Sequence, residues 1–215
     1  AEIRAAVARA AEACAGVEGS WRGCRGAAVA LRDALPADLL AEARGIAAGA
    51  GVGEIEVLLL NSAPPAAAAG EPPAAFVAWG RATMNEETLL GATLSAPAQA
   101  EAAWLVRSPA GGPATAILGL PGQLGGYAGL NAGGVAAAAL DLPAESLAGR
   151  LPVPITLYLS MQAAGTADEA MATAMALPHG AGGQIVWGDG ESGRGVEFTA
   201  RQQRELAPAL STLSA

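Results

Sequence analysis

The sequence is poor in positive charge and in aromatic side chains. None of its 215 residues is lysine, only one is histidine, and aromatic residues make up 4%. The 12 arginines face 20 acidic residues, which leaves a formal net charge of −8. Nucleic acids and anionic membranes bind clustered basic side chains, and no such cluster occurs here beside aromatics. We therefore expect neither nucleic acid nor a membrane as a partner.

Cysteine is nearly absent too, with Cys14 and Cys24 the only two. Two cysteines are too few for a disulfide framework and lack the spacing of a metal site, so we expect no metal, no cofactor and a cytoplasmic location. Helical spacing of apolar residues places Cys14 on a buried helix face as a small core residue. Cys24 lies between Arg22 and Arg25, a setting that favours a reactive thiolate, with a structural role as the alternative.

Long hydrophobic runs are missing as well. No apolar run approaches the roughly 20 residues that a membrane-spanning helix requires. The 52% apolar content comes mostly from alanine and leucine. This predicts close packing of small side chains within a single domain, residues 1–215. Because the sequence begins at Ala1 without methionine, we expect residues before Ala1 to have been trimmed or processed away.

The sequence does contain an ordered series of helix and strand patterns. Apolar residues recur at helical spacing in 3–17 and 35–52, and again within 152–176. Between and after these helices, short apolar runs bounded by turn residues predict strands at 76–79, 89–94, 103–106, 115–118, 134–140, 184–187 and 195–198. This order of helices, strands, helices and strands predicts an α+β architecture with antiparallel strands. The segment 61–75, rich in proline and alanine, is predicted to be an exposed loop.

Six segments of the sequence, in order, resemble segments of one enzyme family. They are EARGIAAGAGVGEIEVLLLN (42–61), AAFVAWGRAT (74–83), LLGATLSA (89–96), GLPGQLGGYAGLNAGGVAAAAL (119–140), TADEAM (166–171) and WGDGESGRGVEF (187–198). The family is that of the cysteine-type N-terminal-nucleophile (Ntn) hydrolases related to isopenicillin N acyltransferase, with acid ceramidase and choloylglycine hydrolase as distant relatives. The resemblance implies a four-layer αββα sandwich with antiparallel sheets. Residues 1–70 would correspond to a helical pro-region and residues 71–215 to the sheet–helix core.

The resemblance also implies an N-terminal cysteine, freed by chain cleavage, that attacks an amide or thioester carbonyl. The residues that would perform this chemistry are replaced here. The cysteine falls at Pro73 or, with a slip of one residue, at Ala74. The family's other polar groups, which include an oxyanion asparagine, fall at Ala92, Thr93, Ser95, Leu140 and Tyr158. Asn131 is retained, although it is equally interpretable as a turn residue.

The few aromatic residues and several acids are the remaining candidates for a site. Converging aromatic side chains would line an apolar pocket, and the alternative is that they fill the core; they are Trp79, Trp104, Tyr127, Tyr158 and Trp187. Asp141 and Glu86 are the candidate catalytic acids. His179 is the only histidine available to a Ser-His-Asp arrangement. Asp189 and Glu191 are predicted to be solvated turn residues, with a cation site as the alternative.

Three hypotheses for function follow. The first is a bacterial pseudo-hydrolase of secondary metabolism that binds a small apolar metabolite. It would either only bind this metabolite or transform it, for example by cyclisation or isomerisation, and it would form no covalent acyl-enzyme. Its substrate-binding residues would be Pro73, Ala74, Trp79, Thr93, Ser95, Trp104, Tyr127, Asn131, Leu140 and Tyr158. The second is an acyltransferase or amide hydrolase with Cys24 or Ser95 as nucleophile. The third is a non-catalytic subunit or scaffold, and a homo-oligomer is compatible with each of them.

Overall fold

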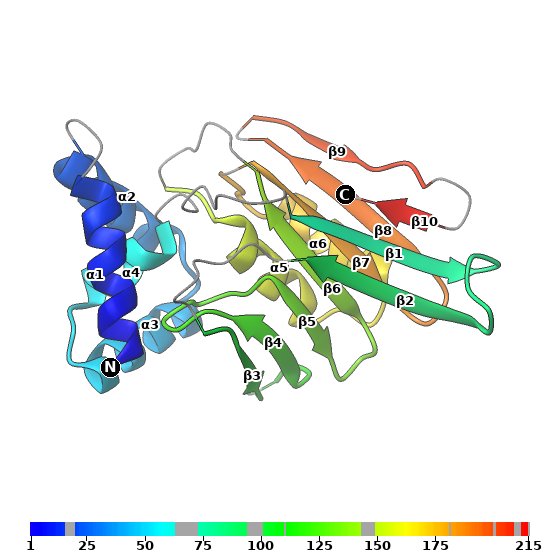
Figure 1. Ribbon diagram of the computed structural model, residues 1–215, viewed down its shortest axis with the longest axis horizontal. Helices are drawn as coiled ribbons and strands as arrows, with labels where there is room; N and C mark the ends of the chain where they lie inside the picture. Colours follow the sequence, from blue (N-terminus) through cyan, green and yellow to red (C-terminus); the bar gives the residue numbers. More distant parts are fainter. Residues whose placement is uncertain are drawn as a thin grey trace.

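The computed structural model describes residues 1–15, 20–62, 73–93, 101–109, 111–142, 149–180, 182–199, 201–208 and 212–214 (Figure 1). The helices in this part of the chain are α1 (Glu2–Ala15), α2 (Ser20–Ala34), α3 (Ala37–Ala50), α4 (Glu54–Ser62), α5 (Val153–Met161) and α6 (Ala167–Ala176). The strands are β1 (Ala74–Gly80), β2 (Glu86–Thr93), β3 (Ala103–Arg107), β4 (Thr115–Gly119), β5 (Ala128–Asn131), β6 (Ala136–Asp141), β7 (Gly183–Gly188), β8 (Gly193–Phe198), β9 (Gln203–Glu205) and β10 (Thr212–Ser214).

The strands form two antiparallel sheets. The smaller sheet has the order β10-β1-β2, and the larger has the order β3-β4-β5-β6-β7-β8-β9. Every strand pair within them is antiparallel. The predicted α+β class with antiparallel sheets is therefore confirmed.

Strand β6 lies at the centre of the layers. Ala137 and Ala139 pack with α5 in the main core, whereas Ala138 and Leu140 pack against β1 of the smaller sheet. Successive side chains of a strand point to opposite faces, so β6 is covered by helices on one face and by the second sheet on the other. Coverage on both faces explains why the sequence of β6 is apolar without interruption. The prediction of a strand at 134–140 was based on this apolar run.

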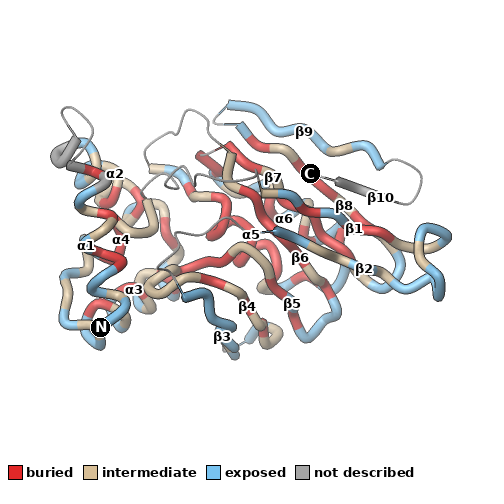
Figure 2. The backbone as a smooth tube through the Cα atoms, viewed as in Figure 1, coloured by how far each residue is buried: buried red, intermediate tan, exposed pale blue. Residues whose placement is uncertain are grey.

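The described layers are the helices α5 and α6, the seven-stranded sheet and the three-stranded sheet. On the outer face of the smaller sheet, Phe76 is 48% exposed and Leu89 is 53% exposed. Figure 2 shows β2 largely exposed along its length. Among the described residues, no helix covers this outer face, where the resemblance implies the fourth layer.

The helices α1 to α4 gather at one end of the two sheets (Figure 1). Asn61 in α4 links them to the glycine-rich segment that follows β4: its side chain donates to the Gly122 carbonyl (2.9 Å) and accepts from the Leu124 N–H (2.8 Å). Within the described part of the chain, no helix is long and apolar enough to cross a membrane.

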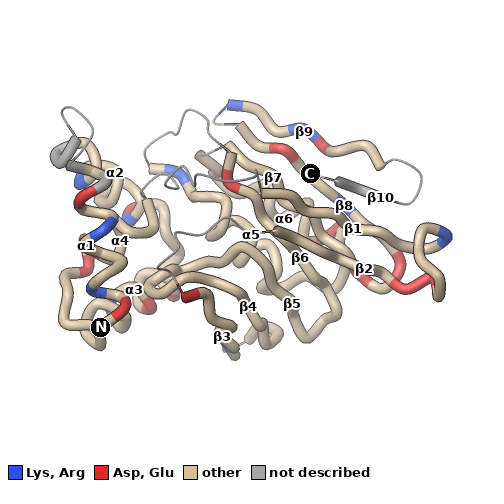
Figure 3. The backbone as a smooth tube through the Cα atoms, viewed as in Figure 1, with Lys and Arg blue, Asp and Glu red and all other residues tan. Residues whose placement is uncertain are grey.

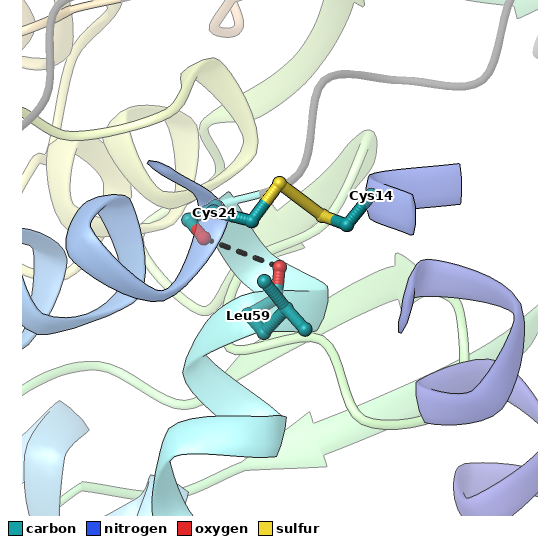
Figure 4. The surroundings of a disulfide bond; sticks show 4 residues. Cys14, Cys24 and Leu59 are labelled. Carbon is teal, nitrogen blue, oxygen red and sulfur yellow. Dashed lines mark hydrogen bonds between the residues drawn. A yellow bond between two sulfur atoms is a disulfide. The ribbon is translucent and has the colours of Figure 1, made fainter. Parts of the chain in front are cut away.

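A disulfide joins Cys14 at the end of α1 to Cys24 in α2, beside Leu59 of α4 (Figure 4). Cys14 is buried, as its helical spacing predicted. Their number and spacing did not predict this bond, which forms because α1 and α2 pack together and bring the two Cα atoms to 6.2 Å, within disulfide reach. With both cysteines bonded, neither has a thiolate to serve as a nucleophile.

Five elements escaped prediction, namely α2, α4, β5, β9 and β10. Helix α2 contains two glycines, and α4 is a short apolar run whose periodicity does not distinguish helix from strand. Strand β5 lies in a glycine-rich segment, and such a composition is typical of a turn. Gly129 in β5 is needed there because a side chain would contact Ile117 of β4.

Candidate functional site

The start of β1, where the resemblance places the nucleophile, is apolar. Pro73 is partly buried and Ala74 is exposed. The Ala74 N–H donates to the Thr93 hydroxyl (2.9 Å), which holds the paired ends of β1 and β2 together. Behind them, Ala75 and Leu140 are buried in one cluster between the two sheets. The structure thus brings Pro73, Ala74, Thr93 and Leu140 into one region, and among these four side chains the only hydroxyl is that of Thr93, which is bonded to the Ala74 backbone.

The aromatic residues do not converge on this region. Trp79 packs between the sheets over Gly193, whose missing side chain leaves room for the indole. Trp104 lies on the edge strand β3 and is 61% exposed. Tyr158 lies beneath the Arg107 guanidinium, 4.5 Å from its ring centre, and Trp187 is fully buried in the main core. Of the two alternatives, core filling describes Trp187 and Tyr158, and the four residues lie on different elements: Trp79 on β1 of the smaller sheet, Trp104 and Trp187 on β3 and β7 of the larger sheet, and Tyr158 on α5.

Asp141 and Tyr127 do meet, and they form the centre of the candidate site. Asp141 ends β6, and Tyr127 lies just before β5 on the neighbouring strand. The Tyr127 hydroxyl donates a hydrogen bond to the Asp141 carboxylate. The Gln123 side-chain amide in turn donates to the Tyr127 oxygen (3.4 Å). Both Tyr127 and Asp141 are partly buried, so the pair lies at the end of the sheet with limited access to water.

Burial raises the pKa of both groups of this pair. It raises the pKa of Asp141 from 3.8 to about 6, and the hydrogen bond from Tyr127 acts in the opposite direction. Burial, together with the negative charge of Asp141, also raises the pKa of Tyr127 above its usual value. Tyr127 is therefore a hydrogen-bond donor near neutral pH, while Asp141 can hold or release a proton there. A carboxyl with a pKa near the working pH is suited to general acid–base catalysis.

The loop that carries Gln123 is held from several sides. The Gln123 side-chain oxygen accepts from the Leu120 N–H (2.8 Å), and the Gln123 carbonyl accepts from Arg107 (3.4 Å). Arg107 also forms an ion pair with Glu42 of α3 (2.6 Å). Neither Gln123 nor Arg107 was predicted from the sequence. The only available signal for Arg107 was its place as a single charge at the end of an apolar strand.

Asn131 is fully engaged within the fold. Its side-chain amide donates to the carbonyls of Met161 (2.9 Å) and Ala164 (2.8 Å), and its oxygen accepts from the Val135 N–H (2.9 Å). It is 3% exposed. Asn131 therefore has a structural role, in keeping with its interpretation as a turn residue. These contacts leave no group of its side chain free for a ligand.

Two further predicted residues lie outside this site. Glu86 begins β2 at the tip of the hairpin, is exposed, and has a positive φ of 58°. The hairpin tip is at the opposite end of the molecule from α1 to α4 (Figure 1), so Glu86 does not join Asp141. Ser95 lies outside the described residues.

The other candidates have structural roles. His179 packs against the Phe198 ring at 4.8 Å, and its Nδ1 lies 3.2 Å from the Leu177 carbonyl oxygen. Burial opposes ionisation of Asp189, but backbone N–H groups that include those of Ala167 and Ser192 outweigh it and lower the pKa of that carboxyl. Asp189 therefore ties the β7–β8 hairpin to the start of α6.

The structure also contains a small surface hollow between α2 and α4. It has a volume of about 220 Å³ and is lined by Arg25, Ile55, Glu56 and Leu59. These residues are all in the N-terminal helices, so the hollow is separate from Asp141. Across the described ranges, no group of three or more histidine, cysteine, aspartate or glutamate side chains is arranged to hold a metal ion.

The raised pKa of Asp141 predicts how folding stability depends on pH. Below about pH 4 the carboxyl is protonated in the folded and the unfolded state, so its burial does not lower folding stability. Once the pH has risen through about 6, the buried carboxyl is ionised and its burial lowers stability by the full amount. Stability from this group therefore falls as pH rises. Urea unfolding measures the free energy of unfolding of the wild type and of Asp141→Asn. Between about pH 4 and pH 7.5, the difference between the two proteins should change by on the order of 2 kcal/mol in favour of the variant. A difference that stays constant with pH would show that Asp141 titrates normally.

No protein-family model matches the sequence, and no curated protein matches it. Three similar solved structures are a mutant of the conjugated bile acid hydrolase from Clostridium perfringens (14% identity, TM-score 0.43), the penicillin V acylase from Agrobacterium tumefaciens (17%, 0.40) and a variant of the same bile acid hydrolase (13%, 0.31). The matches cover 65%, 61% and 68% of this chain, and 52%, 48% and 46% of the respective structures. The chain thus spans about half the length of these structures.

Proposed function

We propose that this protein is a catalytically divergent relative of the Ntn hydrolases that binds a small apolar molecule and transforms it by acid–base chemistry, without an acyl-enzyme. The observation that carries the proposal is the Asp141–Tyr127 pair, in which a partly buried carboxyl has a pKa of about 6. Asp141 would exchange the proton with the bound molecule, and Tyr127 would hold the carboxyl in position. Cyclisation and isomerisation are reactions that one such group can promote.

The apolar start of β1 supports the same proposal. Pro73 and Ala74 offer no nucleophile, and Leu140 stands where the resemblance expects an oxyanion donor. Asp141 directly follows Leu140, so the acid adjoins this apolar region at the end of β6, although the two side chains belong to opposite faces of the strand. The proposed apolar ligand would therefore lie at the end of β6, where the apolar region borders one face of the strand and Asp141 the other.

The absence of acyl transfer is tested with penicillin V and a glycine-conjugated bile acid. We expect no hydrolysis of either compound, and no mass increase of the intact protein after incubation with them. Release of product, or a covalent adduct on the protein, would overturn the proposal and favour the acyltransferase hypothesis.

The acid–base role is tested by screening small apolar metabolites for thermal stabilisation and then for turnover of those that bind. Asp141→Asn is expected to keep binding and to lose about 100-fold or more in turnover, as for other general acids or bases. Tyr127→Phe should shift the pH profile of turnover. A panel that gives no binding, or turnover that survives Asp141→Asn, would contradict the proposal.

Two other predictions bear on this choice. Of the fallback nucleophiles, Cys24 is removed by its disulfide and Ser95 lies outside the described residues, so the acyltransferase hypothesis has no described nucleophile. The cytoplasmic location stays a prediction. The Cys14–Cys24 disulfide weighs against it, because disulfides persist mainly in oxidising compartments.

A further inference from the structure

The edge strand β3 is exposed and apolar on both of its faces. Trp104 is 61%, Leu105 40% and Val106 76% exposed. Figure 2 shows the strand exposed along its length, and Figure 3 shows no charged residue between its two ends. Edge strands of soluble proteins usually carry a charge, a proline or a bulge that prevents further pairing. Residues 103–106 have no charge or proline, and their pairing with β4 is regular.

The hydrogen bonds of the neighbouring strands show which backbone groups of β3 are free. The Ala132 N–H donates to the Ala114 carbonyl (2.7 Å), so even-numbered residues of β4 direct their backbone groups toward β5. The odd-numbered residues of β4, including Ile117, therefore pair with odd-numbered residues of β3 such as Leu105. The N–H and C=O groups of Trp104 and Val106 consequently point to the open edge, where another strand could accept and donate.

We propose that this edge pairs with β3 of a second copy of the chain in antiparallel orientation, and so joins two seven-stranded sheets into one. The free backbone groups fit a register in which Trp104 lies opposite Trp104 of the other copy on the two-fold axis. Ala103 then lies opposite Leu105 of the other copy, so a small side chain faces a large one. The apolar residues are buried against each other, which removes them from water.

The charges at the ends of the strand select this partner and this orientation. Glu101 precedes β3 and Arg107 ends it. In the proposed register each Glu101 lies opposite Arg107 of the other copy, which also keeps its ion pair with Glu42, whereas parallel pairing would place like charges side by side. Each copy carries a net charge of −8, and the uncharged strand lets two such copies approach closely.

The association is tested first on the wild-type protein by sedimentation velocity over a range of concentrations. Pairing of one short strand buries less than the roughly 800 Å² per partner of stable complexes, so we expect a dimer with a Kd of about 10–100 μM. Val106→Lys places a charge on the edge and should raise this Kd about tenfold or more. A wild type that stays monomeric at millimolar concentration would overturn the proposal, as would a Val106→Lys variant that dimerises normally.

Leu130→Lys is the matched control. Leu130 is half exposed on the same apolar face as Trp104 and Val106, but it lies on β5, two strands from the edge. Its Kd should equal that of the wild type, and a loss of dimer would show that the sheet face is the interface instead. Glu101→Arg should weaken the dimer, because it opposes Arg107 of the other copy with a like charge. An unchanged Kd for this variant would refute the antiparallel register.

The register is tested by cross-linking. Opposed residues of an antiparallel pair have Cα atoms about 5.5 Å apart, within the range that a disulfide spans. Since both native cysteines are bonded to each other, Trp104→Cys would introduce the only free thiol. Mild oxidation should convert this variant to a linked dimer much faster than Met84→Cys, whose thiol lies on the exposed hairpin. Equal rates for the two variants would overturn the proposed register.

Discussion

Asn131→Ala is expected to destabilise the protein by about 3 kcal/mol or more, because it leaves several buried polar groups without partners. The lost side chain bonds the carbonyl of Met161, the last residue of α5, the carbonyl of Ala164 beyond it, and the Val135 N–H in the turn before β6. It is thus the contact that fixes the end of α5 on the larger sheet. Urea unfolding followed by circular dichroism measures the effect.

Gln123→Ala is the comparison for this variant. Gln123 also lies in a glycine-rich segment, but its side chain is partly buried rather than enclosed. Its removal should cost about 1 kcal/mol, the usual value for a hydrogen bond that water can replace. If Asn131→Ala were as stable as Gln123→Ala, Asn131 would be free to serve a ligand, and the structural role given to it here would be wrong.

Trp187→Ala is expected to have an effect of similar or greater size, about 4 kcal/mol, because it empties a large volume in the main core. Trp187 is fully buried on β7, and its indole N–H donates to the Ser160 hydroxyl on α5 (3.0 Å). It therefore joins the larger sheet to its covering helix. The change should appear as a lower urea midpoint and a lower Tm.

The contributions of volume and of hydrogen bonding to Trp187 can be separated. Trp187→Phe retains most of the apolar volume and loses the indole N–H, so it should cost about 1–2 kcal/mol. Ser160→Ala removes the acceptor and leaves the volume unchanged. If Trp187→Ala lowered the free energy of unfolding no more than Ser160→Ala, the Trp187 ring would not be part of the core.

The candidate site differs from a hydrolytic one in the side chains that it lacks. The positions that the resemblance assigns to a nucleophile and an oxyanion donor hold Ala74 and Leu140. Among the described residues, the carboxyl closest to these positions in the chain is Asp141, whose pKa burial raises to about 6. The acid–base chemistry proposed above requires fewer groups than acyl transfer.

Much of the secondary structure was predictable because it depends on side-chain spacing along the chain. The helical spacing of α1 and α3, the continuous apolar run of β6, and the turn residues between β7 and β8 are all local features. The start of α6 is a local feature too, because the Thr166 hydroxyl accepts from the Glu169 N–H three residues further on (3.2 Å). These elements needed no knowledge of their neighbours.

The sequence by itself determined the α+β class, most of the strands and the apolar residues Pro73 and Ala74 at the start of β1. Only the tertiary structure decided that Cys14 meets Cys24, that Tyr127 meets Asp141, and that two of the aromatic residues fill the core. The physical reason is that side-chain periodicity is a property of one segment, whereas each of these contacts joins two. Burial of Asp141, which raises its pKa, is created by elements distant in sequence and leaves no trace in the residues around it.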